Sequence, residues 1–106
     1  MEYPENIEEV RKFAEKINID VKYLLGEKFY GGLKLNEIEY LPNNIEFNIS
    51  GNLSVRRLKS LPDNIVFHVG SWLFLYSIES LPSNTIFDVS NKIRFPLDHK
   101  VKVDWT

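Results

Sequence analysis

Three aromatic residues alternate along one short segment, and they are the residues of this sequence best suited to contact another molecule. Trp72, Phe74 and Tyr76 are separated by Leu73 and Leu75. Successive side chains of a β-strand point to opposite faces, so the aromatic side chains point outward if the two leucines point inward. Tryptophan and tyrosine are enriched at the energetic centres of protein interfaces. The pattern therefore predicts a binding surface.

Basic residues flank the aromatic segment on both sides in the sequence. Arg56, Arg57 and Lys59 precede it, whereas Lys92 and Arg94 follow it. We take Arg56, Arg57 and Arg94 as a polar rim that completes the predicted partner-binding surface, because arginine is also enriched in such interfaces. A basic patch of this kind suits an acidic or phosphate-bearing surface. The alternative is an ordinary solvated face, since exposed charges contribute little individually.

Residues arranged for catalysis or metal binding are not evident in the sequence. His68 and His99 are the two histidines, neither has a second histidine or a carboxylate at metal-ligand spacing, and there is no cysteine. We expect His68 on the outward side of its strand, at the surface. No Gly-x-Ser-x-Gly, phosphate-loop or nucleotide-binding motif occurs. The sequence therefore predicts no catalytic residues, no cofactor and no metal site.

A strict repeat must position these residues. Three copies of Leu-Pro-x-Asn begin at Leu41, Leu61 and Leu81, which are equally spaced along the chain. A fixed period of this size indicates a solenoid, in which each unit buries its apolar face only by stacking on its neighbours. Residues 21–40 fit the same frame weakly, as a degenerate first coil. We predict a mainly β fold, a short β-solenoid of about four coils covering 21–40, 41–60, 61–80 and 81–100.

Two strands are expected in each coil. Phe47, Phe67 and Phe87 share one column of the repeat frame, and apolar residues two positions further on form the next column. This period of two indicates a strand with one buried face, and a second alternating segment follows it. Leu-Pro-x-Asn itself is turn chemistry, because proline presets φ and the asparagine side chain bonds the local backbone. We attribute the asparagine column to turn formation alone.

The two ends of the chain are expected to cover the ends of the stack. Residues 4–18 predict an amphipathic helix with an apolar stripe of Ile7, Val10, Ala14 and Ile17. We assign 1–20 as an N-terminal helical cap, 21–100 as the solenoid and 101–106 as a C-terminal cap strand. Alternatively, the helix folds across the aromatic segment and buries it.

Composition limits the class of partner. The 106 residues are 43% hydrophobic and carry a net charge of −2, which argues against a general nucleic-acid binder. Protein is the favoured partner, either a host protein or a second copy in a homodimer. No apolar run reaches membrane-spanning length and no signal peptide is evident, so we expect a cytoplasmic protein without membrane association.

The repeat resembles the Leu-Pro-x-Asn-Leu/Ile-x-Val-x-x-x-Leu-x-Leu units of small bacterial and bacteriophage proteins, loosely grouped with leucine-rich repeats. The resemblance covers residues 41–95 well and 21–40 poorly. The Leu-x-x-Leu-x-Leu-x-x-Asn core of leucine-rich repeats is absent, so a β-solenoid fits better than a horseshoe with a helical back. What the resemblance implies is a binding scaffold without catalytic residues. By analogy with small phage proteins, an anti-CRISPR-like inhibitor of a host defence protein is expected.

Three functions follow from these patterns. The first is a protein-binding module that acts by surface occlusion through Trp72, Phe74 and Tyr76. The second is a structural module whose aromatic face makes a homodimer. The third is an RNA binder that stacks bases on the same aromatic residues.

Overall fold

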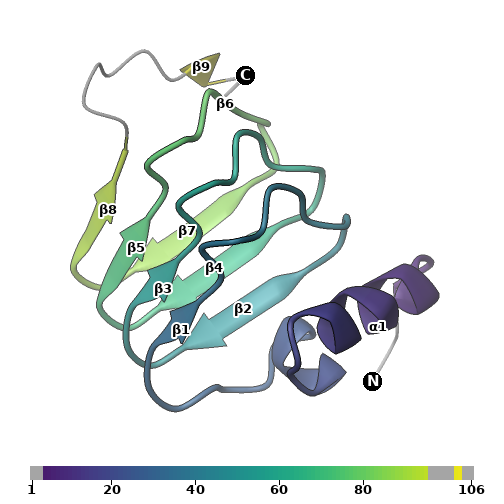
Figure 1. Cartoon of the computed structure of the whole chain (residues 1–106). Coiled ribbons are helices and arrows are strands. Elements are labelled where there is room, and N and C mark those ends of the chain that lie inside the picture. The colour runs from purple at the N-terminus through teal and green to yellow at the C-terminus, as the bar shows by residue number, and fades with distance from the viewer. Residues whose placement is uncertain (1–3, 96–101, 104–106) are drawn as a thin grey trace.

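The chain folds into a short β-solenoid of about three turns with one helix at its N-terminal end (Figure 1). A computed structural model of the chain describes residues 4–95 and 102–103. The order of elements begins with the α-helix α1 (Ile7–Lys16) and the 3-10 helix η1 (Val21–Leu24), and strands follow. The predicted fold class, a mainly β solenoid with an N-terminal helical cap, is confirmed. No helix within residues 4–95 is long and apolar enough to cross a membrane.

Two parallel sheets form the sides of the stack, and each regular coil contributes one strand to each of the two sheets. Sheet A contains β2 (Glu46–Ile49), β4 (Val66–Val69) and β7 (Ile86–Val89). Sheet B contains β1 (Leu33–Lys34), β3 (Leu53–Ser54), β5 (Trp72–Phe74) and β8 (Lys92–Arg94). Figure 1 shows the strands of each sheet lying side by side along the stack. The two sheets place different columns of the repeat on two different outer faces.

The strand register follows the sequence repeat. Phe47 pairs with Phe67 and Phe67 with Phe87 in sheet A, so each step across the sheet advances the chain by one repeat unit. Sheet B advances in the same way, since Leu53 pairs with Leu73. A one-residue slip would turn the apolar column outward, so burial fixes this register. Residues that share a column in the sequence therefore lie beside one another in space.

The interior is filled by the inward columns of both sheets. The rings of Phe47 and Phe67 stack with centroids 5.6 Å apart, and those of Phe67 and Phe87 stack at 5.4 Å. Phe47 and Phe67 are fully buried. Thr85 replaces the isoleucine of its column and is buried with a hydroxyl that has no hydrogen-bond partner among the described residues. Apolar burial along these columns holds the coils together.

Asparagine residues at the Leu-Pro-x-Asn corners do more than form turns. Asn44 and Asn64 have φ of 64° and 60°, in the left-handed region that asparagine tolerates. Their amides also bond from coil to coil: Asn64 Nδ2 donates to Asn44 Oδ1 at 2.9 Å, and Asn84 Nδ2 donates to Asn64 Oδ1 at 3.3 Å. Turn formation alone therefore does not explain this column. We call it the asparagine ladder.

Helix α1 closes the N-terminal end of the stack. It begins at Ile7 and ends at Lys16, shorter than the predicted range 4–18, and it buries Val10, Phe13 and Ala14 in the common core. Asn6 precedes the helix, accepts from Asn44 Nδ2 at 3.0 Å and donates to the Asn43 carbonyl at 2.9 Å. The helix thus extends the asparagine ladder by one step and registers itself on the first corner.

The first and last coils depart from the regular pattern. In the first coil, Leu25 and Phe29 form isolated bridges to β2 instead of a full strand of sheet A. At the other end, β6 (Ser80–Leu81) pairs with β9 (Lys102–Val103), and Lys102 lies two positions beyond the residue that the repeat would place opposite Ser80. The rest of the predicted cap strand 101–106, and residues 96–100 of the last predicted coil with His99, lie outside the described residues.

Candidate binding surface on sheet B

The aromatic segment lies in β5 and the residues directly after it, on the outer face of sheet B. Leu73 and Leu75 are fully buried, whereas Trp72 and Phe74 are half-buried and Tyr76 is 37% exposed. The alternation expected from the sequence is therefore present. Figure 1 shows α1 at the N-terminal end of the stack, away from β5, so the helix does not bury these rings. The alternative placement of the helix across the aromatic face is wrong, because its apolar stripe is used to close the stack.

The three rings form one continuous row. Trp72 and Phe74 stack with centroids 6.0 Å apart and planes inclined by 14°. Phe74 and Tyr76 stack at 5.6 Å with an inclination of 26°. Stacked aromatic pairs gain roughly 0.5–1.5 kcal/mol beyond burial of their area. The three rings therefore partly hold one another in place.

Arginine residues from the two neighbouring coils lie against this row. The Arg94 guanidinium lies over Trp72, 4.9 Å from the ring centroid. The Arg56 guanidinium lies over Tyr76 at 5.2 Å and is 5.8 Å from the Phe74 centroid. Such contacts contribute about 0.5–1 kcal/mol at exposed sites. We call this arrangement of three rings and two guanidinium groups the aromatic–arginine stack.

The register of sheet B explains how these residues meet. Phe74 pairs with Arg94 of β8 on one side and with Ser54 of β3 on the other. Arg56 is the next but one residue after Ser54, on the same face, and so reaches Tyr76. The sequence repeat therefore brings together two arginines that lie far apart along the chain. Arg57, the third arginine of the predicted rim, is exposed in the turn after β3 and is not part of the stack.

A groove runs from the edge strand β1 to the aromatic–arginine stack, and sequence reasoning did not predict it. Its volume is about 730 Å³, and its lining includes Lys34, Asn36, Arg56 and Phe74. The Ser54 hydroxyl donates to Asn36 Oδ1 at 2.6 Å and is buried beside the groove. The groove arises because Ser54 is a small outward residue whose neighbour in the next coil is the large ring of Phe74. A difference in side-chain size between successive members of one column is the signal that would have indicated it.

The outer face of sheet A carries a different set of side chains. His68 lies there, as predicted, with its side chain 38% exposed. Its Nδ1 is 2.9 Å from Asp88 Oδ2, and its Nε2 is 3.7 Å from Glu46 Oε2. Sequence reasoning missed these partners because they lie in the two neighbouring coils, outside any short motif. In the described part of the chain, no group of three histidine, aspartate or glutamate side chains is arranged to hold a metal ion.

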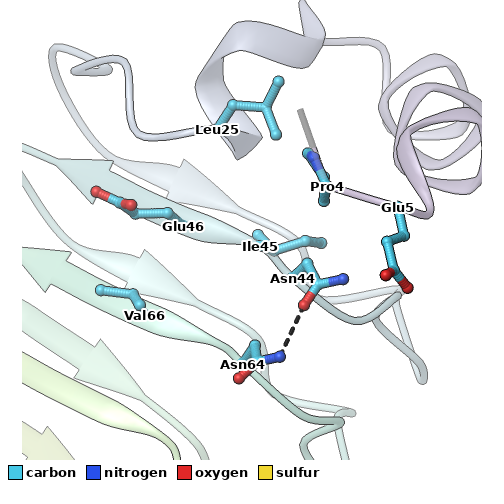
Figure 2. Close-up of a pocket in the computed structure, with 8 residues that line it drawn as sticks. All are labelled: Pro4, Glu5, Leu25, Asn44, Ile45, Glu46, Asn64 and Val66. Carbon is cyan, nitrogen blue, oxygen red and sulfur yellow. Dashed lines mark hydrogen bonds between the residues drawn. The ribbon is translucent and has the colours of Figure 1, made fainter. Parts of the chain in front are cut away.

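A pocket of about 600 Å³ lies between the start of α1 and the outer face of sheet A (Figure 2). Figure 2 shows Glu5 and Glu46 on opposite sides of the view, and a dashed line marks the hydrogen bond between Asn44 and Asn64. Paired carboxylates for acid–base chemistry would have to lie close together. Glu5 and Glu46 therefore do not form such a pair, and the Asn44 and Asn64 side chains that line the pocket bond to each other in the asparagine ladder.

No family model, no curated protein and no solved structure matches this chain. The class of protein is therefore defined by its fold and by its surface. It is a β-solenoid that presents an accessible aromatic–arginine stack on the outer face of sheet B.

Proposed function

We propose that this protein is a non-enzymatic protein-binding module whose anchors are Trp72, Phe74 and Tyr76. Arg56 and Arg94 flank the anchors, and Arg57 lies at the rim. The observation that carries this proposal is the aromatic–arginine stack itself, which remains accessible on sheet B while the α-helix of the described residues covers the end of the solenoid. Contiguous apolar surface of this kind on a folded chain marks interaction sites.

The stack suits binding because its side chains are already held in place. Leu73 and Leu75 anchor the backbone of the segment from inside, and the rings support one another from outside. Ordering a long side chain at an interface costs about 0.5–1.5 kcal/mol, so pre-ordered rings and guanidinium groups retain more of their contact energy. Aromatic residues and arginine are also the residue types that dominate binding energy in measured interfaces.

We further propose that the module acts by surface occlusion of a host protein, as an anti-CRISPR-like inhibitor would. A flat outer face of a sheet has the geometry for covering a partner's surface and needs no catalytic cleft. The likeness of the repeat to units of small phage proteins supports this form of the proposal. Cytoplasmic action in the host belongs to the same proposal.

The first test is a pull-down from host lysate with three baits. They are the wild type, the variant Trp72→Ser/Phe74→Thr/Tyr76→Thr, and a matched control, Val66→Ser/Ile86→Thr, which removes outward apolar side chains from sheet A instead. Circular dichroism and light scattering check the fold and the mass of each bait.

A captured protein supports the proposal if the wild type and the sheet A control hold it and the sheet B variant loses it. The same difference between the baits must appear when each purified bait is mixed with the purified partner. If all three baits hold the same partner, the anchors are misassigned. A third outcome is that no bait holds a partner, the wild type and the sheet A control are dimers, and the sheet B variant is a monomer. In that case the aromatic face serves self-association.

A further inference from the structure

The outer face of sheet B is basic throughout the described residues. Its outward positions carry four cationic side chains and no acidic one: Lys34, Arg56, Lys92 and Arg94. None of the four forms an ion pair with a carboxylate within residues 4–95. Each arginine has five N–H donors in a fixed fork that matches a carboxylate. The donors of this face are therefore left for groups that the described chain does not supply.

The rings of the aromatic–arginine stack favour the same chemistry. Arg94 lies against Trp72, with its guanidinium 4.9 Å from the ring centroid. Arg56 lies beside the Phe74–Tyr76 pair, because its guanidinium is 5.8 Å and 5.2 Å from two centroids that are themselves 5.6 Å apart. The two guanidinium groups thus flank the row from the neighbouring coils. They repel a cation that approaches the rings, so the surroundings of the rings select against a basic partner.

This geometry also separates protein from nucleic acid. Binding of single-stranded RNA depends on stacking bases on open aromatic faces. Here Trp72 and Phe74 are half-buried and guanidinium groups lie against the row, so less ring surface is open to a base. A carboxylate needs no open ring face, because it can approach the edge of a guanidinium group that remains beside its ring.

We propose that the partner presents an acidic segment in which two carboxylate groups flank an apolar side chain. This inference rests on the proposed protein-binding function. The strands β3 and β8, from whose coils Arg56 and Arg94 extend, lie on either side of β5 and so about 10 Å apart across the sheet. The carboxylates of the partner pair with these guanidinium groups, and its apolar side chain packs on the rings between them.

The probe for this inference is a fluorescein-labelled 12-residue peptide that alternates glutamate and leucine, measured by fluorescence anisotropy. The same peptide with lysine in place of glutamate and a labelled 12-nucleotide oligouridine are the competing probes. The variants are Arg56→Gln/Arg94→Gln and Arg56→Lys/Arg94→Lys. The matched control, Lys12→Gln/Lys16→Gln, removes two exposed charges from α1. All four proteins are also used as baits in the pull-down.

We expect the acidic peptide to bind the wild type and the α1 control, and the lysine peptide and oligouridine to bind at least tenfold more weakly. The glutamine variant should lose about tenfold or more in affinity for the acidic peptide, and the lysine variant should fall between, because it keeps the charge but loses the fork. Binding should weaken as salt is added.

Equal binding of the acidic and lysine peptides, preference for oligouridine, or no binding of the acidic peptide at about 1 mM would overturn the inference. The pull-down separates this failure from failure of the proposed function. If the captured partner is lost by the aromatic variant but kept by the glutamine variant, the proposed binding function stands and the inference of an acidic partner is wrong. If the aromatic variant keeps the partner, the binding function itself fails.

Discussion

The outer faces of sheets A and B are built by the same repeat, yet they satisfy their polar groups in opposite ways. On sheet A, His68 bonds to Asp88 and lies near Glu46, so neighbouring coils supply one another's partners. On sheet B, the outward cations lie beside aromatic rings and have no carboxylate partner among the described residues. On a face of the first kind, the polar side chains of neighbouring coils bond to one another and need no further partner. A face whose donors are held in place but unpaired is suited to a partner.

The largest expected effect removes the interior that both faces share. Phe67 is fully buried between Phe47 and Phe87. Phe67→Ala should lower the free energy of unfolding by about 3–5 kcal/mol, because it leaves a cavity between two stacked rings. Chemical denaturation measures this loss. Tyr40→Ala is the control, since that side chain is 78% exposed and its removal should change stability little; a similar loss for both would contradict the packing described.

Binding should distinguish the two faces most directly through single residues. Trp72→Ala should weaken affinity for the captured partner by about 30-fold or more, which corresponds to about 2 kcal/mol, the usual lower bound for a hot spot. Ile86→Ala removes an outward side chain that is 54% exposed on sheet A and should leave affinity unchanged. Isothermal titration calorimetry measures both. Equal losses would mean that the two faces do not differ in function.

The asparagine ladder tests how far internal pairing holds the stack. Asn64→Gly keeps the left-handed backbone open but removes both amide contacts, so unfolding free energy should fall by about 1 kcal/mol. Asn64→Ala should cost about 1–2 kcal/mol more, because alanine disfavours a φ of 60°. Chemical denaturation of the two variants separates the contribution of the ladder hydrogen bonds from that of the left-handed turn backbone. If the glycine variant is as stable as the wild type, the ladder contributes nothing.

Thr85 tests the inward column behind sheet A. Its hydroxyl is buried without a hydrogen-bond partner among the described residues, whereas Ile45 and Ile65 occupy the equivalent positions. Thr85→Val should raise the free energy of unfolding by about 1 kcal/mol, because an unpaired buried hydroxyl is replaced by a methyl group of similar shape. Thr85→Ser keeps the hydroxyl and loses the methyl, so it should lower stability. Thermal unfolding of the pair measures the difference, and a less stable valine variant would show that the hydroxyl is satisfied.

The smallest expected effect concerns His68 on sheet A. Its contacts with Asp88 and Glu46 are exposed to solvent, where such pairs contribute about 0–1 kcal/mol. His68→Gln should therefore lower the free energy of unfolding by less than about 1 kcal/mol and leave partner binding unchanged. Denaturation and titration calorimetry check both statements. A large loss of binding in this variant would move the functional surface to sheet A.

Much of the fold was predictable because the repeat is strict. The constant spacing of the Leu-Pro-x-Asn copies predicts the register, and alternation places Leu73 and Leu75 inside and the aromatic side chains outside. The boundaries of α1 were less predictable, since the ends of a helix depend on contacts such as those of Asn6 with the first corner. The asparagine ladder was missed because each residue also has a sufficient local reason to be in a turn.

The candidate surface was predictable in its members but not in its geometry. Trp72, Phe74 and Tyr76 are neighbours in sequence, and the repeat frame places Arg56 and Arg94 in adjacent coils. The frame did not indicate that both guanidinium groups lie over rings, nor that Arg57 turns away from them. Side-chain direction at a turn depends on the local backbone rather than on the period of the repeat.

The repeat period and the apolar alternation are enough to dictate the solenoid, its register and its buried columns, because they admit one stacking that buries every inward residue. They do not dictate which outward residues pair with each other. That pairing depends on distances between coils in the folded chain, where His68 meets Asp88, while Arg56 and Arg94 lie against rings and have no carboxylate partner among the described residues. The position of α1 is also a property of the folded chain, because the open end of the core and the first asparagine corner come together only once the coils have stacked.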